Sequence, residues 1–130
     1  MYSILIVDDE DNLVEMMRLL FSHRGYRAMV VTSADEAKRV LAESVPDVVL
    51  TDVFPYGSAV MQEVQRLRAS DPRYKNLESA VMSGSSAQNE HLVAVRALST
   101  SGLFFQKGTI DFDHLVRDIT RYLENRIKAA

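Results

Sequence analysis

The chain has 130 residues, of which 47% are hydrophobic and 25% charged, a composition typical of a single globular domain. Its net charge of -3 argues against a general binder of nucleic acids or anionic membranes, and the absence of cysteine excludes a disulfide framework and a thiolate metal site. No apolar stretch is long enough to span a bilayer, and the N-terminus lacks signal-peptide features, so we expect a cytoplasmic protein.

The N-terminal part predicts a strand, a helix and a second strand. The first strand covers residues 4–7, and the amphipathic helix that follows it ends at Gly25. Residues 28–32 form the second strand. The buried helix face is expected to carry apolar residues three and four positions apart, namely Leu13, Met16, Met17, Leu20 and Phe21.

The middle of the chain repeats this alternation. Residues 33–36 match a capping box and open a second helix, and Pro46 returns the chain to a third strand at 48–52. A third helix ends at residues 71–72, and a fourth strand covers 79–83. The third helix has one apolar stripe, formed by Val60, Met61, Val64 and Leu67.

The C-terminal part predicts a weak helix over 87–100, a strand over 103–106 and a strongly amphipathic terminal helix over 112–127. Five strands thus alternate with five helices. Because the strands are short, apolar and rich in β-branched residues, the pattern indicates an α/β fold whose parallel sheet is buried on both faces.

Polar residues of complementary chemistry stand where four of these strands end. Asp8 and Asp9 follow the first strand, Asp52 and Ser83 end the third and the fourth, and Lys107 follows the last. Parallel strands bring such residues to one edge of the sheet. Adjacent carboxylates suit Mg²⁺, while an amine and a hydroxyl can stabilise a transferring phosphoryl group. The sequence therefore predicts a Mg²⁺-dependent phosphoryl acceptor.

These motifs resemble a response-regulator receiver domain, the phosphoacceptor half of two-component signalling. The matching segments are residues 4–10, 48–52, 67–68, 81–84 and 104–107, and the resemblance covers nearly the whole chain. It implies a flavodoxin-like, doubly wound sheet of strand order 2-1-3-4-5 flanked by five helices. It also implies that residues 1–130 form a single receiver domain, which is a signalling module and not an enzyme.

The resemblance further implies that Asp52 receives a phosphoryl group from a histidine kinase or a phosphotransfer protein. It gives Mg²⁺ four ligands: the carboxylates of Asp8, Asp9 and Asp52 and the backbone carbonyl of Phe54.

For the phosphoryl group, the resemblance implies contacts from Ser83 and Lys107. In the family a switch moves the hydroxyl residue inward together with an aromatic side chain, here Phe104. This movement changes the surface formed by the fourth helix, the fifth strand and the fifth helix.

The loop after the acceptor departs from the family pattern. Tyr56 and Val60 stand where the family usually has a proline and a glycine, whereas Pro55 and Gly57 lie nearby at other positions. Gly108 replaces the proline that usually follows the lysine.

These departures leave a pseudo-receiver, a binding module that works without phosphate, as the alternative. A phosphatase with an aspartyl nucleophile would need a second acid where this chain has Phe54, and a nucleotide-binding flavodoxin-like protein would need a glycine-rich loop after the first strand.

The chain ends soon after the last predicted helix, so we expect either a stand-alone receiver or a fragment of a larger regulator. Its expected partners are the kinase and a downstream protein target or output domain, with no direct contact to nucleic acid or membrane. We expect a monomer or a weak homodimer.

Overall fold

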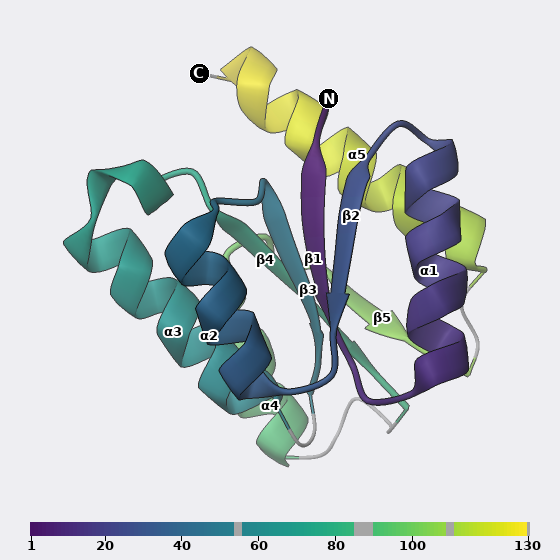
Figure 1. Ribbon diagram of the computed structural model, residues 1–130, viewed down its shortest axis with the longest axis horizontal. Coiled ribbons are helices and arrows are strands. Elements are labelled where there is room, and N and C mark those ends of the chain that lie inside the picture. Colours follow the sequence, from purple (N-terminus) through teal and green to yellow (C-terminus); the bar gives the residue numbers. More distant parts are fainter. Residues whose placement is uncertain (54–55, 85–89, 109–110, 130) are drawn as a thin grey trace.

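The computed structural model describes residues 1–53, 56–84, 90–108 and 111–129 and has three layers, with a parallel sheet between two sets of helices (Figure 1). No helix within these ranges is both long and apolar enough to cross a bilayer. The strands are β1 (Ser3–Val7), β2 (Arg27–Val31), β3 (Val48–Asp52), β4 (Glu78–Ser83) and β5 (Phe104–Gln106). The helices are α1 (Asp11–His23), α2 (Ala34–Glu43), α3 (Gly57–Ser70), the 3₁₀ turn η1 (Pro72–Tyr74), α4 (Glu90–Leu98) and α5 (Phe112–Ala129).

The sheet has the strand order β2-β1-β3-β4-β5, and every neighbouring pair is parallel. The predicted fold class and strand order are therefore confirmed. The strand positions agree within one residue: β1, β2 and β4 begin one residue earlier than expected, β2 also ends one residue earlier, and β5 begins one residue later. Every residue of β3 and β4 is buried, as expected for central strands covered on both faces.

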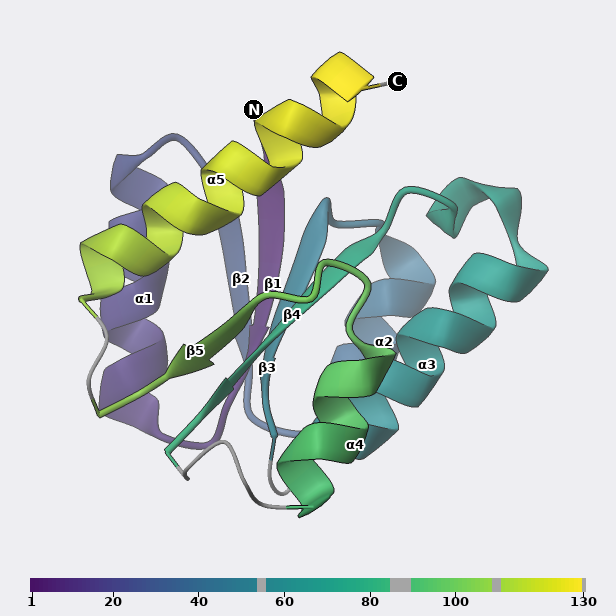
Figure 2. The ribbon, with the colours of Figure 1, turned by 180° about the vertical axis from the view of Figure 1, so that it is seen from behind.

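Alternate side chains of the strands enter two separate cores. Leu5, Val49 and Val81 pack with α2, α3 and α4, whereas Ile4 and Leu50 pack with α1 and α5 on the other face. Figures 1 and 2 show these two helical layers from opposite sides. The two cores hold the strands in register, so that their carboxyl ends meet at a single edge.

The helices follow the predicted apolar patterns with one correction. In α1 the buried residues are Val14, Met17 and Phe21, whereas Met16 is 40% exposed and was wrongly expected in the core. The predicted stripe of α3 is buried throughout. The weak helix expected over 87–100 corresponds to α4, whose start lies next to residues 85–89, outside the described ranges.

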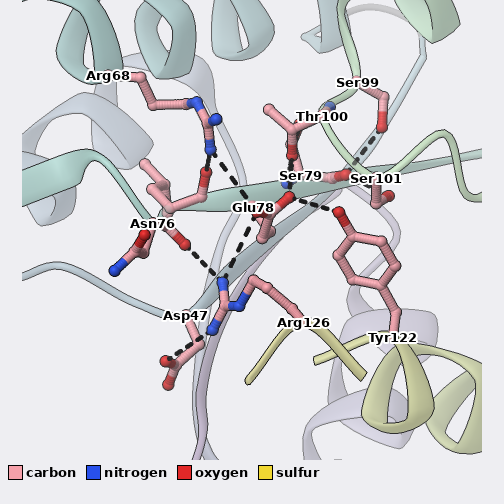
Figure 3. A network of polar contacts seen from close by, with 11 residues as sticks. Asp47, Arg68, Asn76, Glu78, Ser79, Ser99, Thr100, Ser101, Tyr122 and Arg126 are labelled. Atoms are coloured by element: carbon pink, nitrogen blue, oxygen red, sulfur yellow. Dashed lines mark hydrogen bonds and ion pairs between the residues drawn. The ribbon is translucent and has the colours of Figure 1, made fainter. Parts of the chain in front are cut away.

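A polar network surrounds Glu78 at the amino end of β4, the end opposite Ser83 (Figure 3). Its carboxylate accepts hydrogen bonds from the Thr100 hydroxyl at 2.6 Å and the Tyr122 hydroxyl at 3.0 Å. The guanidinium groups of Arg68 and Arg126 each lie 3.8 Å from it. This network joins β4 to α3, to the segment after α4 and to α5.

Candidate functional site

The three predicted acids converge at the carboxyl edge of the sheet. Asp8 follows β1 and Asp52 ends β3, in strands that are paired up to Val7 and Thr51. Together with Asp9 they form a cluster in which one carboxylate oxygen from each residue lies within 4.8 Å of the others. Asp8 and Asp52 are buried, whereas Asp9 is exposed. The cluster therefore combines two buried carboxylates, from Asp8 and Asp52, with the solvent-exposed carboxylate of Asp9.

Asp52 is the most perturbed acid of the site. It is 1% exposed, and neither carboxylate oxygen has a partner with full hydrogen-bond geometry in the described part of the chain, although the backbone N–H of Tyr56 is close enough to lower its pKa. Burial, followed by repulsion from Asp8, raises the pKa of Asp52 to about 7, although Lys107 acts in the opposite direction. The negative charge of Asp52 is therefore only partly balanced by the surrounding protein groups. A bound cation or a covalent substituent on the carboxylate would relieve this imbalance.

Lys107 follows β5 directly, and its ammonium group lies beside the acids of the site. Its Nζ is 2.6 Å from Asp8 Oδ2 and 3.4 Å from Glu10 Oε1. Burial by itself lowers the pKa of Lys107, but the hydrogen bond to Asp8 and the neighbouring negative charges outweigh burial and raise it. The side chain is therefore a fixed positive charge at the site.

Ser83 and Lys107 are coupled through the backbone. The sheet register pairs Ser83 with Gln106, and the Lys107 amide donates to the Ser83 carbonyl at 2.8 Å. Ser83 is 5% exposed, and a Cβ added at the adjacent Gly84 would have no heavy atom within 4 Å. The Ser83 side chain is therefore buried, whereas the position of a Gly84 side chain is open among the described residues.

Phe104 begins β5 and is partly buried against the core formed with α2, α3 and α4. The backbone carbonyl of Phe54 lies outside the described residues. Sequence reasoning assigned no role to Glu10, although this acid adjoins the Asp8–Asp9 pair and contacts Lys107. The position of Glu10 directly after Asp8 and Asp9 was the one sequence signal for a role. Its ion pair with Lys107 forms only because the fold brings the end of β5 close to the end of β1.

Comparison with known proteins identifies the family. Residues 4–119 match the family described as response regulator receiver domain. The chain belongs to this family. One curated relative of the receiver is the transcriptional regulatory protein AfsQ1 of Streptomyces coelicolor, which is 27% identical over 71 residues. The match covers 55% of this chain and 32% of that protein, so the receiver spans only part of the relative's length.

Solved structures show the same fold as the receiver. A CheY-like receiver domain protein from Methanospirillum hungatei has a TM-score of 0.79 at 14% identity, and the match covers 100% of this chain and 99% of that one. The response regulator TrrA from Thermotoga maritima, in complex with Mg²⁺-BeF, has a TM-score of 0.71 at 19% identity, with coverages of 94% and 99%.

The donor set of the receiver fits Mg²⁺. Asp8, Asp9 and Asp52 offer only oxygen ligands, which this hard cation prefers, and the exposed Asp9 leaves room for retained water. The two buried Asp52 oxygens, which have no partner with full hydrogen-bond geometry among the described residues, are the strongest sign, because such groups are otherwise costly.

Gly57, the first residue of α3, lies very close to the backbone of Asp52. A Cβ at this position would clash with the Asp52 carbonyl oxygen and would lie 3.1 Å from Val95 Cγ1. The first residue of α3 therefore packs directly on the backbone of Asp52, and only glycine permits this approach without a shift of the neighbouring atoms. The position where the family usually has a glycine carries Val60 instead, which is buried.

We predict that Gly57→Ala destabilises the receiver by about 1–3 kcal/mol, because backbone atoms cannot move aside as a flexible side chain can. Urea unfolding followed by circular dichroism measures this loss. The matched control is Gly108→Ala. A Cβ added there would have no heavy atom within 4 Å among the described residues beyond its chain neighbours, so the free energy of unfolding should change by less than about 1 kcal/mol. Equal stability of the two variants would contradict the predicted clash.

Proposed function

We propose that the protein is a phosphoacceptor receiver of a two-component system, in which Asp52 accepts a phosphoryl group from a phosphohistidine. The observation that carries the proposal is the nearly complete burial of Asp52 within a cluster of acids, with both oxygens lacking a partner of full hydrogen-bond geometry among the described residues. A carboxylate in this situation is a strong candidate nucleophile.

In the proposed reaction an Asp52 carboxylate oxygen forms a bond to phosphorus while the bond between phosphorus and the donor imidazole nitrogen breaks. The imidazole nitrogen keeps the electron pair and takes a proton from solvent. Lys107 is already a positive charge beside the acids, and its ammonium group would contact an oxygen of the transferred group. The Ser83 hydroxyl would donate a hydrogen bond to another oxygen.

Asp8, Asp9 and Asp52 would hold Mg²⁺, with the Phe54 carbonyl as a further ligand. When bound, the cation neutralises the acid cluster and the charge of the phosphoryl oxygens. After transfer, Ser83 and Phe104 would move inward and alter the surface formed by α4, β5 and α5, which links the chemistry to a readout.

The proposed partners follow from this role. A histidine kinase or phosphotransfer protein supplies the phosphoryl group, and a downstream protein or an output domain reads the altered surface. Residues 1–130 would act as a single receiver domain in the cytoplasm, as a monomer or a weak homodimer.

The test is incubation of the protein with acetyl phosphate and Mg²⁺, followed by intact-mass spectrometry. We predict that the wild type gains one phosphoryl group and that Asp52→Ala gains none, because the nucleophile is lost. Addition of EDTA should suppress labelling of the wild type. A wild type that stays unlabelled at every donor and Mg²⁺ concentration would overturn the proposal.

A pseudo-receiver that binds its partner without phosphate is the second candidate. The observation that favours it is the buried Val60 at a position where the family usually has glycine, together with the close packing of Gly57 on Asp52. Equal affinity of the wild type and Asp52→Asn for the partner, with and without a phosphodonor, would support this alternative.

A further inference from the structure

Phe104 lies between the sheet and α4, on the edge strand. β5 has three residues and pairs only with β4, with Phe104 opposite Val81. The next residue, Phe105, is 4% exposed and packs on the opposite face, toward α1 and α5. Phe104 is only partly buried and packs against the core that the sheet forms with α2, α3 and α4.

Arg96 covers this ring from α4. Its Cζ lies 5.3 Å from the centroid of the Phe104 ring, within the range of a cation–π interaction. Arg96 is exposed, stands in the last turn of α4 and makes no ion pair with a carboxylate among the described residues. The aromatic ring is therefore the one partner that the described structure gives to this guanidinium group.

We propose that Arg96 is a positioning residue that holds Phe104 against α4 and thereby restrains phosphorylation of Asp52. The inference rests on the proposed function, because it regulates that same site. If Phe104 moves inward when Asp52 is phosphorylated, the ring must leave the guanidinium group. The contact between Arg96 and Phe104 then favours the unphosphorylated arrangement.

The size of this restraint follows from the populations of the two arrangements. If acetyl phosphate labels the inward arrangement, the labelling rate is proportional to the fraction of molecules in that arrangement while this fraction is small. Loss of an exposed cation–π contact changes such an equilibrium by about two- to fivefold. Arg96→Ala should therefore raise the initial rate of Asp52 labelling by acetyl phosphate by up to about two- to fivefold.

The experiment compares the wild type with Arg96→Ala, Arg96→Lys and the control Arg39→Ala, which removes an exposed arginine from α2. The first readout is the Mg²⁺-dependent labelling rate. The lysine variant keeps a cation and should fall between the wild type and Arg96→Ala, while the control should match the wild type.

The second readout is ¹⁹F NMR of protein labelled with 4-fluorophenylalanine. The chain has five phenylalanines, and the variant Phe104→Leu identifies the Phe104 signal. In unphosphorylated Arg96→Ala this signal should move toward its position in the phosphorylated wild type. A merely structural role of Arg96 would not produce this directed shift.

The outcomes separate the two proposals. Normal labelling of the wild type with an unchanged rate in Arg96→Ala would overturn the role of Arg96 alone, whether or not the Phe104 signal moves. A faster rate without the directed shift would also overturn it. Absence of labelling in every protein, the wild type included, would overturn the proposed function and the restraint that depends on it.

Discussion

Replacing Asp52 with asparagine should stabilise the folded protein by about 2–4 kcal/mol at pH 8 in the presence of EDTA. The pKa of Asp52 rises from 3.8 to about 7 on folding, with burial as the largest cause. Each unit corresponds to about 1.4 kcal/mol, and the lower value allows for screening at the solvent-facing edge of the site. The amide has a similar shape but no charge, so it avoids this cost.

The stabilisation should depend on pH in a defined direction. Below pH 3.8 the carboxyl group of Asp52 is protonated in both the folded and the unfolded protein, and no penalty exists. As the pH rises to about 7, the folded protein retains the proton that the unfolded chain has lost, so the wild type becomes less stable. The gap between Asp52→Asn and the wild type should therefore widen from pH 4 to 7 and then stay constant.

Urea unfolding of both proteins at several pH values measures this gap. The control is Asp35→Asn, which changes an exposed acid in the first turn of α2 and should cost less than about 1 kcal/mol. Saturating Mg²⁺ should stabilise the wild type more than Asp52→Asn and so narrow the gap. If the difference in stability between Asp52→Asn and the wild type were the same at pH 5 and pH 8, the raised pKa of Asp52 would be contradicted.

The sheet could be predicted because its signals are local. A fully buried parallel strand such as β3 requires consecutive apolar residues, and the positions of the polar residues after each strand mark where it ends. Given the parallel strands, the meeting of Asp8, Asp52 and Ser83 at one edge follows from topology alone.

Features that depend on tertiary approach could not be predicted. Met16 and Val14 both fit an apolar helical pattern, and only the position of α1 on the sheet decides that Val14 is buried. Tyr74 is a further case, since it lies in a turn yet is 2% exposed and donates its hydroxyl hydrogen to the Leu41 carbonyl. The contacts of Gly57 and Arg96 likewise join elements that are separate in the sequence.

Glu78→Leu should destabilise the protein by about 3 kcal/mol. Glu78 is 7% exposed and is the shared acceptor of the network in Figure 3. Without its carboxylate, the hydroxyls of Thr100 and Tyr122 lose an acceptor, and two guanidinium groups lose their nearest buried negative charge. The cost arises mainly at the two part-buried hydroxyls, because the guanidinium groups stay partly exposed and keep their hydrogen bonds to the Leu77 and Asn76 carbonyls.

Two further variants separate charge from hydrogen bonding. Glu78→Gln keeps an acceptor for Thr100 and Tyr122 but loses the charge, so its cost should be roughly half that of Glu78→Leu. Glu15→Ala removes an acid that is 53% exposed and paired with Arg18 on α1, and it should cost less than about 0.5 kcal/mol. Urea unfolding at pH 7 ranks the three variants. If Glu78→Leu were as stable as Glu15→Ala, the Glu78 contacts that join α5 and the segment after α4 to β4 would not contribute measurably to stability.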